Sequence, residues 1–410
     1  MIMANIKPVK IGLVGSGAIS YTYLNTLTSG LAAVEVVGCS DLIPERSKAR
    51  AELFGIRQMT TEEIMADPEI ELVLNTTQLW NHNKITKMAL EAGKHAYSEK
   101  AFGHEIEGAR ENYELAKKKG LLVGCAPDCY MGSAWQTARK LIDDGYIGIP
   151  LICYSQCMRG YSSHERGSPP PGFVRDPMMG ARGTTVTYDM GGYYINVLVN
   201  LFGAVKRVSG YSQVFTGGRT HSNTQNPSYG EPISKEGGEN VMLGALEFES
   251  GVYGALVLCS EAFGPEVPRV DIYGTEGHLT LPDPNNFGGW GNEVVILQRK
   301  GSGRESFRVP FTHGFSDTDP SIKPKSGKGE PCHNSWRGIA VVDMAYAIRR
   351  GRPARSSADL ALHVVEIVDA IDKSNVDNQV HTMVTRPAKP AALKPGHFGS
   401  ASVMEASLDT

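Results

Sequence analysis

The first third of the chain constrains the fold most, because short apolar segments alternate there with stretches of helical pattern. Between residues 10 and 125 the apolar segments are KIGLVG, VEVVGCSD, ELVLNTT, HAYSEK and LLVGCA. This alternation is typical of βαβ units, in which parallel strands are covered by the connecting helices. The sequence therefore predicts an α/β domain with a doubly wound parallel sheet over residues 1–127.

The pattern changes after residue 127. Apolar, β-branched segments separated by turn signals predict an open, mostly antiparallel sheet, and they lie at residues 150–160, 240–251, 252–262, 269–282 and 293–300. Residues 337–373 read as two helices, with Ser356 or Ser357 capping the second. We expect an α+β domain over 128–385. The proline-containing tail, 386–410, is predicted to be extended or disordered.

Composition excludes several classes of protein. The 410 residues carry a formal net charge of -3, so no basic field favours nucleic acid. No apolar run resembles a signal peptide or a membrane span, which predicts a cytoplasmic protein that binds no membrane. The odd number of cysteines, 7, fits reduced thiols better than a disulfide framework. Cysteines four residues apart without nearby histidines predict no structural metal.

A glycine-containing turn follows the first predicted strand. In IGLVGSGAIS, Gly15 and Gly17 lack side chains where a backbone can approach a pyrophosphate at a helix N-terminus, and Ser20 stands where a third glycine is usual. Asp41 ends the next strand, where a carboxylate can accept hydrogen bonds from the ribose hydroxyls of NAD and repels the 2′-phosphate of NADP. This context predicts a Rossmann dinucleotide site that prefers NAD over NADP. The alternatives are a mere tight turn and a phosphate role for Arg46. The residues expected at the cofactor in this turn and strand are Gly15, Ser16, Gly17, Ala18, Ile19 and Asp41.

Over nearly its whole length the sequence resembles the glucose–fructose oxidoreductase, inositol dehydrogenase and rhizopine-catabolism (Gfo/Idh/MocA) family. The segment ALEAGKHAYSEKAF carries the first part of the resemblance, with Glu99 and Lys100 in a motif that ends in Glu-Lys-Pro in the family. Ala101 replaces the proline. The resemblance implies that Lys100 reaches the reacting hydroxyl beside the nicotinamide. We expect burial near a bound cation to lower the pKa of Lys100, which would make it a usable proton relay.

The second part of the resemblance is TYDMGGYYINVLVNLFG. Asp189 and Gly191 match the family, and Tyr193 replaces its histidine, as in the glucose–fructose oxidoreductase and dihydrodiol dehydrogenase branches, where the tyrosine is the expected proton carrier. Asp189 and Tyr193 are one helical turn apart and should share a face, with Asp189 orienting the pair or capping the helix. Tyr194 is the adjacent candidate, but a helix turns it about 100° away, into packing.

Further candidate residues lie at the carboxyl ends of predicted strands, where doubly wound sheets hold ligands. In the family the loop with Asn75, Thr77 and His82 lines the ribose and nicotinamide; for His82 a structural role is an equal alternative. Asp128 and Tyr130 follow the last strand of the first domain and are expected to face the substrate. The long Pro/Gly-rich stretch 162–183 has the composition of a binding loop or lid.

The resemblance implies an NAD-dependent dehydrogenase that oxidises a ring hydroxyl of a sugar, glycoside or inositol, with Lys100, Asp189 and Tyr193 as the catalytic group. One alternative is a glycoside-cleaving enzyme that uses transient oxidation with bound NAD. The other is a non-catalytic sugar or nucleotide sensor, against which the retained proton-relay residues argue. An open second-domain sheet with an apolar face predicts a homo-oligomer, a dimer or tetramer.

Overall fold

The computed structural model describes residues 6–103, 106–158, 186–215, 220, 229–232, 239–262, 270–288, 295–299, 306–317, 319 and 335–409. The predicted loop 162–183 lies outside these ranges. Within them, no helix is long and apolar enough to cross a membrane.

The N-terminal domain is a six-stranded parallel sheet in the order β3-β2-β1-β4-β5-β6. Order and direction are those of a Rossmann sheet, so this part of the predicted fold class is confirmed. The strands are β1 Val9–Val14, β2 Val34–Ser40, β3 Arg57–Gln58, β4 Leu72–Asn75, β5 His95–Ser98 and β6 Val123–Cys125. The helices are α1 Ala18–Leu27, α2 Pro44–Phe54, α3 Thr61–Ala66, α4 Leu79–Glu91 and α5 Ile106–Lys119.

The C-terminal domain contains a nine-stranded sheet in the order β14-β13-β12-β11-β7-β10-β9-β8-β15. Only β7 and β10 pair in parallel; every other neighbouring pair is antiparallel, which confirms the predicted open and mostly antiparallel sheet. The strands are β7 Pro150–Met158, β8 Val205–Gln213, β9 Val241–Phe248, β10 Tyr253–Cys259, β11 Val270–Gly274, β12 Gly277–Leu281, β13 Val295–Arg299, β14 Ser306–Val309 and β15 His381–Thr382.

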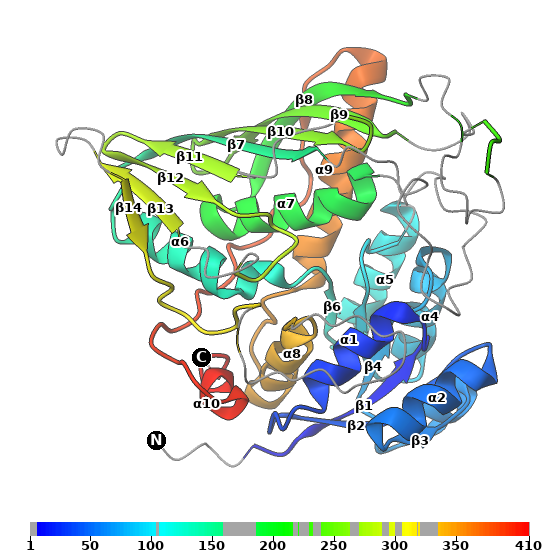
Figure 1. The fold of residues 1–410 in the computed structure, drawn as a ribbon. Helices are drawn as coiled ribbons and strands as arrows, with labels where there is room; N and C mark the ends of the chain where they lie inside the picture. Colours follow the sequence, from blue (N-terminus) through cyan, green and yellow to red (C-terminus); the bar gives the residue numbers. More distant parts are fainter. Residues whose placement is uncertain are drawn as a thin grey trace.

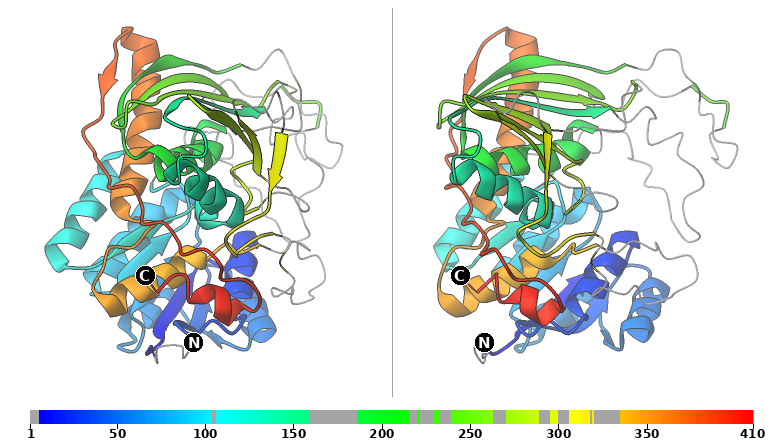
Figure 2. Two further views of the ribbon diagram at one scale, coloured as in Figure 1. Left: turned by 90° about the vertical axis from the view of Figure 1, so that its left-hand side faces the viewer. Right: turned by 60° about the vertical axis from the view of Figure 1, so that its left-hand side comes forward.

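Helices cover one face of this sheet (Figures 1 and 2). They are α6 Ser133–Asp143, α7 Val186–Phe202 and α9 Ala358–Asp377. The other helices of this part of the chain are η1 Cys129–Met131, α8 Ile339–Arg350 and α10 Ala401–Glu405. α7 is the core of the domain, because nearly all of its side chains are buried, and it packs against α9 and β10.

The two helices predicted over 337–373 are confirmed as α8 and α9. Ser357 is the cap of α9, because its hydroxyl accepts the backbone N–H of Leu360. Both helices also contact the Rossmann domain: α8 packs on α1 and β6, and α9 packs on α5 and β6. In Figure 1, α9 accordingly runs from the N-terminal sheet up to the C-terminal sheet. The first domain is therefore completed by helices that belong to the second half of the sequence.

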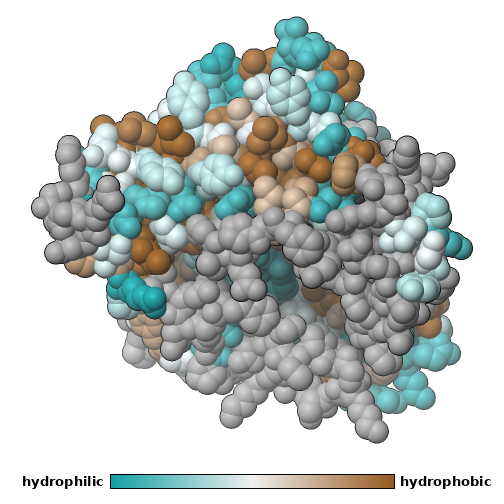
Figure 3. Space-filling model, turned by 45° about the horizontal axis from the view of Figure 1, so that its top comes forward, coloured by the Kyte–Doolittle hydropathy of each residue, from teal (hydrophilic) through white to brown (hydrophobic). Residues whose placement is uncertain are grey.

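Within the described ranges, no helix lies on the opposite face of the large sheet, which presents apolar side chains. Residues paired directly across strands share a face, and Tyr253, Ile152 and Tyr273 form one such row. Tyr211 and Leu243 belong to a second row. All five are exposed, by 45–67% of their surface, and Figure 3 shows brown and pale side chains gathered over this part of the molecule.

Candidate active site

The turn after β1 brings two loops of the Rossmann sheet into contact. Gly15 has φ +100°, and a Cβ there would lie 2.7 Å from the backbone of Thr76 and Thr77, after β4. Gly17 begins α1, has open space where a Cβ would project, and provides no side-chain cap for the helix. The first turn of α1, with Ala18 and Ile19, therefore offers N–H groups and a positive dipole end without an acidic side chain, which suits a pyrophosphate.

Asp41 lies beside this turn, immediately after β2. Its Oδ2 accepts the backbone N–H of Ser16 at 2.7 Å, and its Oδ1 accepts that of Ile43 at 2.8 Å. These two bonds hold the carboxylate at the edge where the adenosine ribose of a dinucleotide binds in this fold. Each oxygen retains acceptor capacity, so the position fits the predicted contact to ribose hydroxyls.

The predicted residues after β4 are tied to one another. Asn75 is fully buried; its amide donates to the carbonyl of His82, and its Oδ1 accepts the hydroxyl of Thr77 at 2.6 Å. The ring nitrogens of His82 each lie 3.0 Å from a carbonyl, one of Thr77 and one of Ala101. Burial lowers the pKa of His82, although the contacts with the two carbonyls oppose this shift. These contacts give His82 a structural role, linking the β4 loop to the segment that carries Lys100.

Lys100 follows β5, and its Nζ forms an ion pair and hydrogen bond with Asp189 in the first turn of α7. The peptide between Lys100 and Ala101 is cis. Glu99 is buried; it accepts the hydroxyl of Tyr23 from α1 at 2.7 Å and the backbone N–H of Lys100 at 3.1 Å. The segment after β5 and α7 are thus joined through the pair of Lys100 and Asp189.

The pKa of Lys100 depends on both burial and the negative groups around it. Burial by itself lowers it, but the carboxylate of Asp189 and the other negative groups nearby outweigh burial, and the net pKa is raised. In the cofactor-free protein the shift of the pKa of Lys100 is therefore upward, because the carboxylate of Asp189 contacts Nζ. The lowering beside a bound cation stays a prediction. In neutral solution the side chain is an ammonium that donates hydrogen bonds.

Tyr193 lies one turn after Asp189 and is almost fully buried. Lys100 Nζ is 6.0 Å from the centre of its ring. Its hydroxyl accepts a hydrogen bond of 2.6 Å from Nη1 of Arg337. Burial raises the pKa of Tyr193 to about 12, although the cations Arg337 and Lys100 oppose the rise. In the cofactor-free protein the phenol is therefore protonated at neutral pH, while the two cations beside it favour its charged form.

The two residues expected to face the substrate, Asp128 and Tyr130, and the adjacent candidate Tyr194 are buried, with partners inside the protein. Asp128 Oδ2 accepts the backbone N–H groups of Gly338 and Ala340, at the start of α8. The hydroxyl of Tyr130 donates to Ser356 at 3.2 Å, and that of Tyr194 to Asp283 at 3.4 Å. These contacts describe packing and capping roles, and for Tyr194 they agree with the packing expected from the helix register.

Arg337 is the functional candidate that sequence reasoning missed. It was taken as the first residue of a helix, whereas α8 begins at Ile339 and Arg337 precedes it. Its partner Tyr193 lies 144 positions away in the sequence. The only local signal is a charged residue in SWRGIA, just before an apolar helix.

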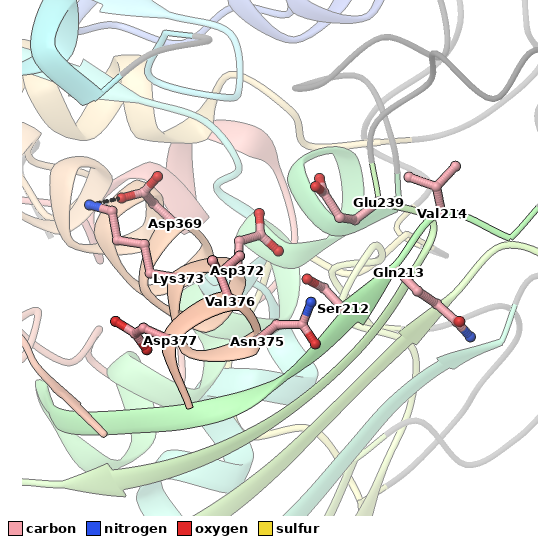
Figure 4. A pocket seen from close by; sticks show the side chains of 10 residues that line it. All are labelled: Ser212, Gln213, Val214, Glu239, Asp369, Asp372, Lys373, Asn375, Val376 and Asp377. Atoms are coloured by element: carbon pink, nitrogen blue, oxygen red, sulfur yellow. Dashed lines mark ion pairs between the residues drawn. The ribbon is translucent and has the colours of Figure 1, made fainter. Parts of the chain in front are cut away.

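A separate hollow lies at the carboxyl end of α9 (Figure 4). It is lined by Ser212, Gln213, Val214, Glu239, Asp369, Asp372, Lys373, Asn375, Val376 and Asp377. Lys373 is paired with Asp369 at 2.7 Å. Lys100 faces the other half of the same helix, near Ala361 and Val364, so no predicted site residue lies in this hollow.

The fold and the glycine turn define an oxidoreductase with a nicotinamide dinucleotide-binding domain, and comparison with known families agrees. Residues 9–126 match the model described as oxidoreductase family, NAD-binding Rossmann fold. Residues 135–280 match the GFO/IDH/MocA C-terminal domain. The chain belongs to the Gfo/Idh/MocA family of oxidoreductases.

Among curated proteins, the chain is 23% identical over 299 residues to a scyllo-inositol 2-dehydrogenase (NAD(+)) of Bacillus subtilis, covering 72% of this chain and 78% of that protein. It is 31% identical over 156 residues to an inositol 2-dehydrogenase/D-chiro-inositol 3-dehydrogenase of Lactiplantibacillus plantarum, covering 37% of this chain and 44% of that one. An uncharacterized oxidoreductase of Schizosaccharomyces pombe is 30% identical over 202 residues, 48% of this chain and 53% of its own. The chain thus spans about half the length of these last two relatives.

Among solved structures, an NAD binding oxidoreductase from Klebsiella pneumoniae has a TM-score of 0.74 at 19% identity, covering 92% of this chain and 99% of the other. At this identity the likeness concerns the fold.

Proposed function

We propose that the protein is an NAD-dependent dehydrogenase that oxidises a ring hydroxyl of a sugar, glycoside or inositol by hydride transfer. The observation that carries the proposal is the ion pair between Lys100 and Asp189 beside the buried hydroxyl of Tyr193, at the carboxyl edge of the Rossmann sheet. An ammonium and a phenol directed at one place can polarise and protonate or deprotonate an alcohol oxygen. The inositol dehydrogenases among the relatives support this substrate class.

In the proposed mechanism Lys100 donates a hydrogen bond to the substrate oxygen, and Asp189 holds the ammonium in place. Bound oxidised nicotinamide supplies the hydride acceptor. The ionised oxygen of Tyr193 would take the hydroxyl proton while the C–H hydride leaves for the nicotinamide, which converts the alcohol to a carbonyl. In reverse, the protonated Tyr193 returns its proton to the carbonyl oxygen. The positive charge of oxidised nicotinamide would favour the ionised form of the phenol and so favour oxidation.

We propose NAD as the preferred cofactor because Asp41 places a negative charge where the 2′-phosphate of NADP would lie. The turn with Gly15 and Gly17 leaves backbone N–H groups for the pyrophosphate. The loop of Asn75 and Thr77 lies at the carboxyl end of β4, against the turn at Gly15. We assign this loop to the ribose and nicotinamide side of the site.

A screen that follows nicotinamide absorbance over inositols, sugars and glycosides, with NAD and NADP in parallel, tests the proposal. Net reduction of free NAD by one of these alcohols is the expected result. Cleavage of a glycoside without net NAD turnover would instead establish the glycoside-cleaving alternative. Binding of a sugar or nucleotide with no turnover of any substrate would establish a sensor.

We further propose that the exposed face of the nine-stranded sheet associates with a second copy of the chain. Its rows of Tyr253–Ile152–Tyr273 and Tyr211–Leu243 are uncharged and continuous across neighbouring strands. A self-complementary apolar face is typical of symmetric dimers. Light scattering should find a dimer or tetramer in the native protein and monomers in Ile152→Asp; a monomeric native protein would contradict this assignment.

A further inference from the structure

Arg337 connects Tyr193, the candidate proton carrier, to Asn285 in the loop after β12. Its Nη1 donates to the hydroxyl of Tyr193 at 2.6 Å, while its Nη2 donates to Oδ1 of Asn285 at 2.6 Å and to the carbonyl of Asn285 at 3.2 Å. The guanidinium carbon also lies 5.0 Å from the centre of the Tyr193 ring. One planar cation therefore fixes both the position of the phenol oxygen and the loop that faces it.

Both anchors of Arg337 are themselves held. The backbone N–H groups of Gly338 and Ala340, directly after it, donate to the buried carboxylate of Asp128 at 2.8 and 3.2 Å. Asn285 belongs to the loop after β12, whose neighbouring N–H groups, those of Phe287 and Gly288, each donate to Asp317 at 2.7 Å. The backbone next to Arg337 and the loop of its partner Asn285 are therefore both held in place, which fixes the position of the guanidinium.

The hydrogen bond also sets which way the phenol proton can point. Because Arg337 has only donors, the oxygen of Tyr193 must be the acceptor in this contact. The tyrosine proton, when present, is left to point toward another acceptor. A phenolate at this position would receive the Arg337 hydrogen bond in a stronger, charge-assisted form.

We propose that Arg337 is a positioning residue that orients the Tyr193 hydroxyl toward the substrate and favours its ionised form during proton transfer. The inference rests on the proposed function, in which Tyr193 carries the proton. The charged and titratable groups that face Tyr193 are Lys100 and Glu99 after β5, Cys129 in η1, and Arg337 before α8. Arg337 and Lys100 are the two that favour the phenolate, and Arg337 is the one in direct contact with its oxygen.

The test measures ionisation of Tyr193 directly and does not depend on turnover. Because burial raises the pKa of Tyr193 to about 12, tyrosine is replaced throughout by a fluorinated tyrosine, whose phenol ionises at a lower pH. Fluorine nuclear magnetic resonance then follows the phenol through alkaline titration, and the spectrum of Tyr193→Phe identifies its signal. In Arg337→Gln the titration of Tyr193 should move up by about 1–3 pH units, the usual effect of losing an opposite charge in contact. If this variant does not fold, Arg337→Lys replaces it, with a rise at the lower end of that range because an ammonium cannot reproduce the planar fork.

Arg350→Gln is the matched control, because this arginine is paired with Asp409 at the surface, on the far end of α8. It should leave the Tyr193 titration unchanged. An unchanged titration in the folded Arg337 variant would overturn the inference.

Kinetics gives a second readout once a substrate is known. The pH at which kcat for oxidation levels off should rise in Arg337→Gln, with a smaller effect on KM. Failure of the proposed function has a different signature: Tyr193→Phe would then keep its turnover, while the titration of Tyr193 would still respond to Arg337.

Discussion

The carboxylate of Glu405 accepts the backbone N–H of Ala33 at 2.8 Å, which joins the end of the chain to the loop before β2. Its other oxygen accepts the N–H of Ala32 at 2.7 Å. Glu405 is fully buried in α10, a helix that was not predicted in the tail. Residues 386–400 run without helix or strand and lead α10 to the Rossmann domain, where Figure 2 shows it beside α8.

Glu405→Ala should lower the free energy of unfolding by about 2–5 kcal/mol, because the buried N–H of Ala33 and the more exposed N–H of Ala32 both lose a charge-assisted partner. Urea titration of the whole chain measures the change. Glu107→Ala, which removes an exposed carboxylate from α5, is the control and should stay within about 0.5 kcal/mol of the native protein. Equal stability of the two variants would show that the tail does not hold the first domain.

His363 in α9 should make stability depend on pH. It is fully buried, its Nε2 accepts the N–H of Val205 at 3.0 Å, and burial lowers its pKa to about 3. Between that value and about 6.5 the unfolded chain binds a proton that the folded chain excludes. This residue's contribution to stability is therefore complete above about pH 6.5 and falls by about 1.4 kcal/mol per unit as the pH drops.

The comparison with His363→Gln isolates this effect, because the other titrating groups are common to both proteins. When the pH falls from 7 to 5, the native protein should lose more of its unfolding free energy than His363→Gln does. Parallel curves over this range would mean that His363 titrates in the folded state.

Asp41→Asn should reduce the preference for NAD. The amide keeps an acceptor for one of the two N–H groups of Ser16 and Ile43 but removes the charge that faces a 2′-phosphate. We expect the ratio of the two dissociation constants, measured by calorimetric titration, to shift toward NADP by about tenfold, which corresponds to about 1.4 kcal/mol. If the native protein binds NADP more tightly than NAD, the assignment of Asp41 to the ribose hydroxyls is wrong, and a phosphate role for Arg46 is favoured.

Tyr193→Phe and Tyr194→Phe form a matched pair, because each loses one buried hydroxyl and keeps its ring. Tyr193 bonds Arg337 at the site, whereas Tyr194 bonds Asp283 through a long contact of 3.4 Å. Turnover should fall by about a hundredfold or more in Tyr193→Phe and stay near the native value in Tyr194→Phe. The thermal midpoints of both should remain close to native. The reverse pattern of turnover would make Tyr194 the proton carrier.

The sequence predicted what local patterns encode. The strand–helix alternation, the glycine turn and the helical spacing of Asp189 and Tyr193 all depend on near neighbours, and each lies where the pattern indicated. It could not predict contacts between distant segments. The pairing of Lys100 with Asp189, which raises the pKa of the lysine, spans 89 positions.

Contacts between distant segments also explain why Asp128 and the tail differ from the predictions. Asp128 follows a strand of a cofactor domain, which suggests a ligand-facing residue, but the arrival of α8 turns it into a cap for that helix. The tail has little apolar periodicity of its own. It is ordered by partners elsewhere, such as Gln136, which accepts the N–H of Leu393 at 3.0 Å.

The central claim is that Lys100 acts on the substrate oxygen in a nicotinamide-dependent oxidation. Measuring NAD binding and turnover of the best alcohol on the same preparation of Lys100→Ala tests it most directly, with Lys87→Ala on α4 as the exposed-lysine control. The account predicts NAD binding close to native and turnover lower by about a hundred- to ten-thousand-fold, with the control unchanged. Turnover above about a tenth of the native rate would contradict it, because that loss is smaller than the least expected from removing an acid–base group.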